Sequence, residues 1–338
     1  MDWPVVVLFG TLLVALIVGV PIIWSLALAS VASIALNPSL TFVVVGQRMF
    51  AGADSFSLLA VPAFMLAGDV MSQGGLSKRL IDFAEALVGW IAGGLSIVAV
   101  AACAFFAAIS GSSMATTASI GGVMYPEMVK RGYPKAYSAA IQAIGGTLGV
   151  VIPPSIVFVI YGTVTGVSIS KLLMSGIIPG IFCGLALAVY CYVVAKRSNF
   201  PKGAAFKPMN VLVAFKRAFW ALMMPVIILG GIYASVFTPT EAAVVSVFYG
   251  VFVCMFLYRE VDAKKLWGIC QHTAIITANL MGLVATASVF AYLVTIYNIP
   301  TRITEFFMGF CDTLVLFMLI INVIMIFAGM FLDNGSII

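Results

Sequence analysis

A group of hydroxyl side chains inside a long apolar run is the part of this sequence best suited to binding chemistry. The run covers residues 93–128, and its midpoint carries a glycine and five hydroxyls: Ser110, Ser112, Ser113, Thr116 and Thr117. In a bilayer, polar side chains at this depth are tolerated only where protein or water satisfies them. Several oxygens suffice to bind a hard monovalent cation such as Na⁺. We therefore expect an ion or substrate site here. The alternative is that small residues simply allow close helix packing.

A second polar interruption follows in the next apolar stretch. Its residues combine glycines, prolines and hydroxyls and include, in order, Gly145, Gly146, Thr147, Pro153, Pro154 and Ser155. The prolines remove two backbone donors, and the glycines allow unusual φ angles. A helix broken at mid-span exposes carbonyls that suit a cation and an N-terminus that suits an anion. We expect this break to be the second half of the first site, with a simple kink as the alternative.

A similar polar group lies at the end of the sequence and consists of Asp333, Asn334, Gly335 and Ser336. A carboxylate at membrane depth is costly, so we expect it to be functional. It would bind a cation directly or hold a proton. An apolar run ends at Ile338 without a polar flank. We therefore also expect the polypeptide to be truncated there, and the second site to be incomplete.

Composition indicates the class of protein. Hydrophobic residues make up 63% of the chain and charged residues 9%, and the mean hydropathy is +1.18. Several apolar stretches reach the ~20 residues that cross a bilayer as a helix. We predict an all-α polytopic membrane protein. The net charge of +5 comes from loop Lys and Arg, which set orientation in the bilayer and do not indicate a nucleic acid partner.

The sequence does not predict an enzyme, a cofactor or a transition-metal site. The six cysteines lie in apolar surroundings without metal-ligand spacing. An intramembrane hydrolase needs a nucleophile with a base, and the chain has one histidine, His272, and no pair of buried acids. We expect His272 and Asp69 to be interfacial, and Glu241 to cap a helix rather than touch substrate.

Helices are expected over about 4–19, 22–36, 56–71, 136–166, 171–195, 218–235, 240–258 and 269–297, with amphipathic stretches at 76–88 and 300–312. A connection at 196–217 holds several Lys and Arg and no acid, which places it in the cytoplasm. Counting from it, the first hairpin (93–128) enters from the cytoplasm. A second hairpin, beginning near Thr313, enters from the opposite face.

A shift of 223 residues lays Ser110 on Asp333 and Ser113 on Ser336, and the order of the elements repeats with it. Two copies in opposite orientation are typical of inverted-repeat transporters. We therefore predict inverted repeats with two re-entrant helical hairpins and broken helices. The expected parts are scaffold helices at 1–73, a transport part with the first hairpin and broken helix at 74–170, connecting and scaffold helices at 171–298, and the start of the second hairpin at 299–338.

A carrier is the function that fits these features best. A channel-type subunit that passes ions or small solutes is the alternative. It would need a continuous polar pore, and no helix carries a sustained polar stripe.

Four motifs resemble the large membrane subunit of tripartite ATP-independent periplasmic (TRAP) transporters: residues 74–76, 109–128, the break at 145–155 and residues 238–243. The resemblance covers essentially the whole chain. It implies a Na⁺-coupled carrier of the elevator type in the bacterial inner membrane. It also implies three partners: a small four-helix membrane subunit, a periplasmic substrate-binding protein, and an organic acid such as a sialic acid or C4-dicarboxylate.

The motifs together predict two sets of residues. The Na⁺ set is Ser110, Ser112, Ser113, Gly145, Gly146, Thr147, Pro153, Asp333 and Ser336. The substrate set is Thr116, Thr117, Pro154, Ser155 and Asn334. Na⁺ would be the coupling ion, and no other cofactor is expected. Members of the family continue beyond the second hairpin into a second broken helix.

Overall fold

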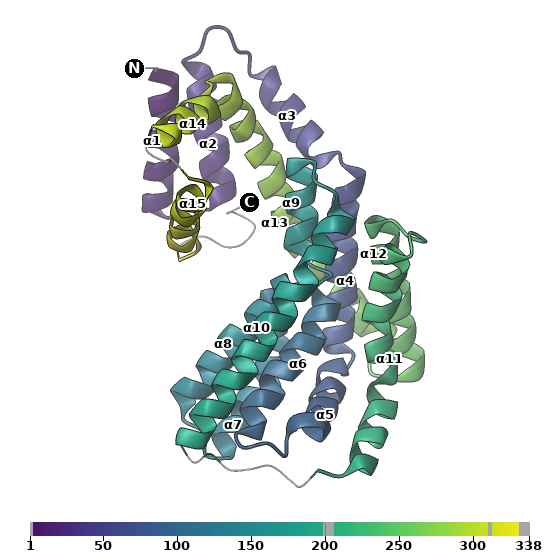
Figure 1. Ribbon diagram of the computed structural model, residues 1–338. Coiled ribbons are helices and arrows are strands. Elements are labelled where there is room, and N and C mark those ends of the chain that lie inside the picture. The colour runs from purple at the N-terminus through teal and green to yellow at the C-terminus, as the bar shows by residue number, and fades with distance from the viewer. Residues whose placement is uncertain (1–2, 199, 201–205, 310–312, 331–338) are drawn as a thin grey trace. The chain divides into compact units, whose positions relative to one another are not determined.

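The computed structural model describes residues 3–198, 200, 206–309 and 313–330, and every regular element within these ranges is helical (Figure 1). Five helices are long and apolar enough to cross a membrane, and a bent pair of shorter helices adds a sixth candidate span. The prediction of an all-α polytopic membrane protein is therefore confirmed. The chain forms two compact units, one of residues 56–275 and one of the residues on either side.

The unit built from the two ends of the chain contains α1 (Trp3–Val18), α2 (Ile22–Ala35), α3 (Val43–Ala53), the later turns of α13 (Ala263–Ile296), α14 (Ile299–Met308) and α15 (Leu314–Gly329). Its core consists of Leu8, Ala29, Ile34, Val289 and Leu293, which come from α1, α2 and α13. The Ser33 hydroxyl joins the same three segments, because it donates to the Pro4 carbonyl at 2.8 Å and lies 3.0 Å from the Tyr297 hydroxyl.

Helix α3 is not among the helices expected from the sequence. Its eleven residues include two glycines, a glutamine and an arginine, so no long apolar run marks it. The guanidinium of Arg48 stacks over the Tyr292 ring with 3.9 Å between the guanidinium carbon and the ring centroid. A polar residue of α3 is therefore held by an aromatic residue of α13, a contact that no local pattern reveals.

The unit of residues 56–275 contains η1 (Phe56–Leu59), α4 (Ala60–Gln73), α5 (Leu76–Val88), α6 (Gly94–Ser110), α7 (Ser113–Lys130), α8 (Lys135–Val151), α9 (Ile156–Thr165), α10 (Ile169–Arg197), α11 (Pro208–Tyr233), α12 (Pro239–Phe252), the π-helix η2 (Val253–Leu257) and the first turns of α13. Helix α6 packs against α4, α5, α7, α8 and α10, and most of its residues are buried. It is the central helix of this unit.

Helices α6 and α7 form a helical hairpin within the residues predicted for one. Only Gly111 and Ser112 separate them. At the far end of α7, Arg131 Nη1 lies 3.2 Å from Glu85 Oε1 of α5, the helix that precedes α6. Helix α7 therefore returns to the end of the unit at which α6 begins.

The boundary of α11 differs from the sequence prediction. The helix begins at Pro208 rather than near 218, so Lys216 and Arg217 lie within it and not in a connection. Proline suits the first helical turn, because the N–H that it lacks would have no partner there. The charged residues in these early turns lower the local hydropathy, so the hydropathy pattern does not indicate a helix there. Because α10 runs to Arg197 and α11 begins at Pro208, the two helices end and begin closer together in the sequence than predicted.

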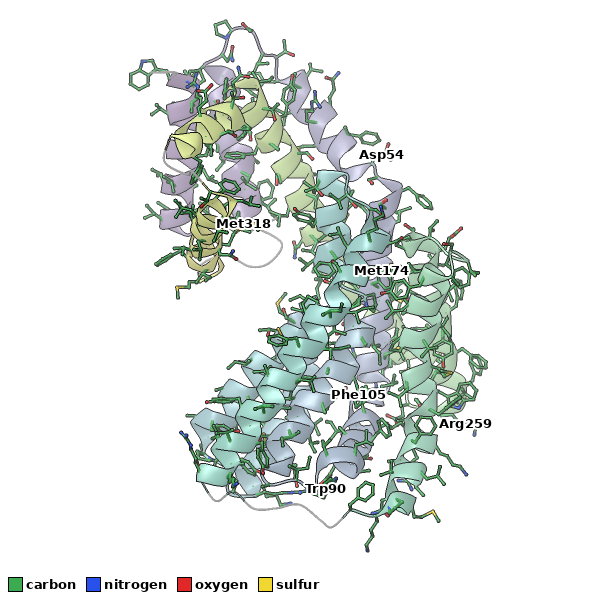
Figure 2. The ribbon with its side chains drawn as sticks, viewed as in Figure 1. Asp54, Trp90, Phe105, Met174, Arg259 and Met318 are labelled. Carbon is green, nitrogen blue, oxygen red and sulfur yellow. The ribbon has the colours of Figure 1, made fainter. Side chains whose placement is uncertain are left out.

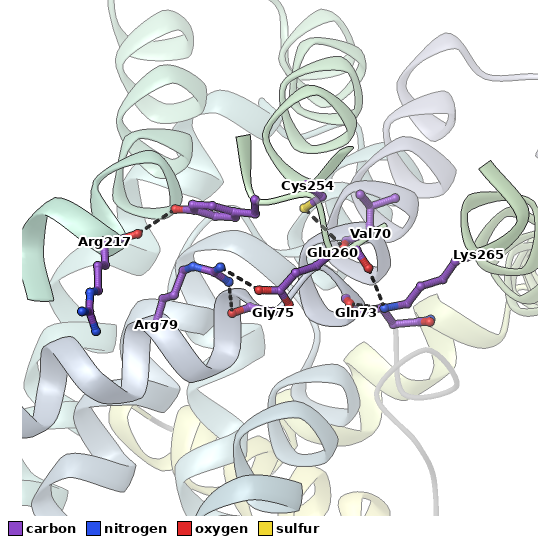
Figure 3. A network of polar contacts seen from close by, with 9 residues as sticks. Val70, Gln73, Gly75, Arg79, Arg217, Cys254, Glu260 and Lys265 are labelled. Carbon is purple, nitrogen blue, oxygen red and sulfur yellow. Dashed lines mark hydrogen bonds and ion pairs between the residues drawn. The ribbon is translucent and has the colours of Figure 1, made fainter. Parts of the chain in front are cut away.

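A network of polar contacts ties the turn between α4 and α5 to the connection between η2 and α13 (Figure 3). Arg79 Nη2 lies 2.6 Å from Glu260 Oε1. The same guanidinium stacks over the Tyr258 ring at 3.9 Å. Lys265 Nζ donates to the Gln73 carbonyl at 2.7 Å. These contacts anchor the beginning of α5, the helix that leads into the hairpin.

We predict that Arg79→Ala destabilises the protein more than Glu260→Gln. The Arg79–Glu260 pair is partly exposed, and such pairs contribute about 1 kcal/mol or less. Removing Arg79 also removes the ring contact, which adds about 1 kcal/mol. Thermal unfolding of the purified protein in detergent measures both changes, with Lys78→Ala on the exposed side of α5 as the control. Equal melting temperatures for Arg79→Ala and Lys78→Ala would contradict the role given to the network.

Candidate functional site

The tip of the hairpin is a tight reversal of the backbone. Gly111 ends α6 with φ +62°, the left-handed conformation that glycine adopts most readily. Ser112 follows in an extended conformation, and its hydroxyl caps α7 by accepting from the Ala115 N–H at 3.4 Å. The sequence G-S at this point thus supplies both the end of one helix and the beginning of the next.

Hydroxyls of the tip bind one another inside the protein. Ser110 and Thr116 are buried, and their side-chain oxygens lie 2.9 Å apart. The Thr116 hydroxyl also lies 2.8 Å from the Ser112 carbonyl, to which it donates. Three of the residues predicted from the sequence are therefore in one hydrogen-bonded cluster, with oxygens directed at each other across the reversal.

The break between α8 and α9 is shorter than predicted. The two helices bend by 43°, and only residues 152–155 interrupt them. Gly145, Gly146 and Thr147 are helical, so the expectation that the interruption begins at Gly145 with unusual φ angles is wrong. The break itself holds Pro153 and Pro154 and ends at Ser155, whose hydroxyl accepts from the Phe158 N–H at 3.4 Å.

The glycines of α8 allow close packing against α7. A side chain on Gly146 would overlap the Thr117 hydroxyl, and one on Gly149 would overlap the Ser112 carbonyl. Gly145 faces Cys103 of α6, with 3.1 Å from the position of an added Cβ to the sulfur atom. Small residues therefore bring the backbone of α8 against the tip, as they do between membrane helices in general.

The tip and the break are in direct contact. The Gly111 carbonyl accepts from the Ile156 N–H at 3.2 Å. A Cβ on Gly111 would lie 2.5 Å from the Pro154 carbonyl oxygen. Two helices, α6 and α8, thus end at this place, and two, α7 and α9, begin there. Helix C-termini present carbonyls without intrahelical partners, and N-termini present such N–H groups. The arrangement can hold a cation and an anionic group side by side.

Not all predicted residues face this place. The Thr147 hydroxyl donates to the Ile144 carbonyl at 2.7 Å on the exposed side of α8, so its side chain does not join the tip. Ser113 is the first residue of α7 and is half-buried. Asp333, Asn334 and Ser336 lie outside the described residues.

The sequence interpretation missed the partners of Asp69. This side chain is 18% exposed, and its Oδ2 atom lies 3.1 Å from His272 Nδ1. It also accepts from the Thr273 hydroxyl at 2.7 Å. Its neighbour Gly68 packs on Ser110, 3.2 Å from an added Cβ to the Ser110 Cα. The sequence signal for these contacts is an acidic residue one turn before the end of an apolar helix, where a carboxylate needs polar partners.

Glu241 has the capping role predicted from the sequence. Its Oε2 atom accepts from the Thr238 N–H at 2.8 Å, and the Glu241 N–H donates to the Thr238 hydroxyl at 3.2 Å. This capping box fixes the start of α12. Within the described ranges, no three His, Cys, Asp or Glu side chains gather as metal ligands would.

A family model described as the tripartite ATP-independent periplasmic transporter, DctM component, matches residues 9–338. The chain belongs to this family. The resemblance predicted from the motifs is confirmed, and with it the location in the bacterial inner membrane.

Relatives in the TRAP family are similar over nearly the whole chain. The isethionate TRAP transporter permease protein DctMQ of Oleidesulfovibrio alaskensis is 41% identical over 331 residues, or 98% of this chain and 52% of the relative. The C4-dicarboxylate TRAP transporter large permease protein DctM of Pseudomonas aeruginosa is 41% identical over 291 residues, or 86% and 68%. The sialic acid TRAP transporter permease protein SiaT of Haemophilus influenzae is 32% identical over 321 residues, or 95% and 52%. This chain spans about half the length of DctMQ and SiaT.

We predict that Gly111→Ala damages the hairpin more than Gly132→Ala. Both glycines have a positive φ, but only Gly111 lies against another backbone segment, whereas an added Cβ on Gly132 meets nothing within 4 Å. Each substitution costs about 1–2 kcal/mol for the left-handed conformation. Gly111→Ala costs about 1–3 kcal/mol more from overlap with Pro154. Melting temperatures of the two variants measure the difference, and equal values would show that tip and break do not touch.

Proposed function

We propose that this chain is the large membrane subunit of a Na⁺-coupled secondary transporter that imports an organic acid anion. The observation that carries the proposal is the meeting of four helix ends at a cluster of buried hydroxyls. Binding sites formed by broken helices at mid-membrane are typical of carriers. Membership of the TRAP family supports the class of protein, and the relatives named above are permeases rather than enzymes.

Na⁺ would bind beside the ends of α6 and α8. Ser110 provides a hydroxyl oxygen there, and the terminal carbonyls of both helices provide partial negative charge. We now also propose Thr116 for the ion, although the sequence motifs assigned it to the substrate, because its hydroxyl lies 2.9 Å from that of Ser110. The Pro153 carbonyl lies in the break that follows α8 and would be a further ligand of this Na⁺ ion. Gly145 and Gly146 would contribute by letting α8 approach, rather than as unwound ligands. We keep Asp333 and Ser336 as proposed ligands of a second Na⁺ ion.

The substrate would lie beside the beginnings of α7 and α9. Ser155 caps α9 there, and the Thr117 hydroxyl lies against Gly146 of α8. Helix N-termini favour anions. The three relatives above are named for isethionate, C4-dicarboxylates and sialic acid, all of which are organic acids. We infer an organic acid anion for this chain, with Asn334 of the second hairpin as a further contact.

An elevator movement is part of the proposal, with a moving part at 93–166 plus the second hairpin. The packing of helices supports an inverted repeat. Helices α1 and α2 pack against the later turns of α13, and in the corresponding place α12 packs against α4 and α11 packs against α12. A shift of 223 residues lays α13 on α3 to α4. The small four-helix subunit and a periplasmic binding protein would complete the transporter.

Uptake into liposomes tests the ion site. We predict saturable, Na⁺-dependent uptake by the full-length permease with its small subunit and binding protein. Ser110→Ala and Thr116→Ala should raise the Na⁺ concentration for half-maximal uptake several-fold, because a lost contact of this kind costs about 1–3 kcal/mol. Thr147→Ala is the matched control, since its hydroxyl faces away, and should behave as wild type. Equal Na⁺ dependence in all four proteins would refute the ion site.

Labelling of single cysteines tests the topology. Cysteines at Lys78 and Lys130, which flank the hairpin, should both react with an impermeant maleimide from the cytoplasm. A cysteine at Thr301 in α14 should react from outside. The signal is compared with the parent protein, because native Cys183 is exposed. Labelling of Lys78→Cys and Lys130→Cys from opposite faces would mean that the segment crosses the membrane and is not re-entrant.

A further inference from the structure

A cavity of about 370 Å³ lies between α5 and the beginning of α11, away from the hairpin tip. Its lining includes two acids, two bases and two aromatic residues: Asp82, Glu85, Lys207, Arg217, Trp90 and Phe206. Trp90 lies at the end of α5 from which the chain continues to α6 (Figure 2). Nothing in the proposed transport mechanism uses this cavity.

The two helices that form the cavity run antiparallel. Phe83 contacts Phe215 with 5.9 Å between ring centroids, and Trp90 contacts Phe206 at the same distance. Increasing numbers along α5 therefore meet decreasing numbers along α11. Asp82 lies level with the turn of Arg217, and Trp90 lies level with Lys207. The cavity thus has an end with Asp82 and Arg217 and an aromatic end beside Lys207.

Charges of both signs face the cavity without pairing across it. Glu85 pairs with Arg131 outside the lining. Among the described residues, no ion pair within 4.0 Å includes Asp82, Lys207 or Arg217. Opposite charges that line a space yet stay apart leave room for a ligand that carries both signs itself. A purely anionic ligand would be repelled by the carboxylates of Asp82 and Glu85.

The residues around the cavity have the pattern of a membrane–water interface, and the topology predicted from the sequence puts this end of the unit on the cytoplasmic side. The first ten residues of α11 contain Lys216 and Arg217, and its continuous apolar stretch begins only after them. Helix α5 is amphipathic, with Leu80 and Phe83 buried and Lys78 and Asp82 exposed. Half-exposed Trp90 is a typical residue of the membrane–water interface. Basic pockets at this depth bind lipid headgroups.

We propose that this cavity binds the headgroup of a phospholipid that carries both a phosphate and a primary ammonium group, as phosphatidylethanolamine does. Arg217 attracts the phosphate and Asp82, at the same end of the cavity, attracts the ammonium, while Lys207 adds positive charge at the aromatic end. The side-chain amide of Asn210, which also lines the cavity, adds a hydrogen-bonding group. Phosphatidylglycerol lacks the cation, and the quaternary ammonium of phosphatidylcholine has no N–H to donate to Asp82.

Native mass spectrometry of the full-length permease with its small subunit tests the proposal. Synthetic phosphatidylethanolamine, phosphatidylglycerol or phosphatidylcholine is added in mild detergent, and bound lipid is counted. We expect at least tenfold tighter binding of phosphatidylethanolamine than of either other lipid. Asp82→Asn should weaken phosphatidylethanolamine binding at least fivefold and strengthen phosphatidylglycerol binding. Arg217→Gln should weaken the binding of both lipids.

Asp54→Asn and Lys264→Gln are the matched controls, because both side chains are exposed and lie outside the cavity. They should bind all three lipids as wild type does. Equal binding of the three lipids to wild type, or no effect of Asp82→Asn, would overturn the proposal. Displacement of the lipid by soluble phosphoethanolamine at equal concentration would overturn the lipid assignment in favour of a soluble zwitterion.

Discussion

A backbone that stops being helical inside a bilayer must find partners for its free carbonyls and N–H groups, and the unit of residues 56–275 is organised around this constraint. Helix α6 of the hairpin ends at Gly111, and α8 of the broken helix ends at Ile152. These two helix ends pack against each other. The Gly111 carbonyl accepts from the first N–H of α9. Hydroxyls of Ser110 and Thr116 fill the space beside them. An ion site at this place would use groups that already have to be present to satisfy the fold.

Close packing between α7 and α8 keeps the two stopping points together. Gly146 and Gly149 lie against Thr117 and the Ser112 carbonyl, where any side chain would overlap. Because α8 stays helical up to Val151, its terminal carbonyls point in one direction toward the break. A rigid arrangement of this kind favours movement of the whole hairpin and broken helix together, as the elevator proposal requires, over local opening of the tip.

The sequence predicts most elements and the contact of the hairpin with the break, because apolar runs, glycines and prolines are local signals. The helix end near residue 19, the amphipathic helix α5 and the helix cap at Glu241 follow from such signals and are present. The role of the glycines in α8 could not be predicted, since a glycine permits both unwinding and close approach, and only the neighbour decides. The contacts of Asp69 with His272 and Thr273 join helices about 200 residues apart, and no pattern within either helix reveals them.

The proposed ion lies where α6 and α8 end, and an experimental density map of the protein in a lipid nanodisc tests this position most directly. Two maps are needed, one in high Na⁺ and one with choline in its place. We expect a density beside Ser110 and the Pro153 carbonyl that is present only in Na⁺. If the two maps are identical at the tip, or if a Na⁺-dependent density lies elsewhere in residues 56–275, the hydroxyl cluster is a packing feature and not an ion site.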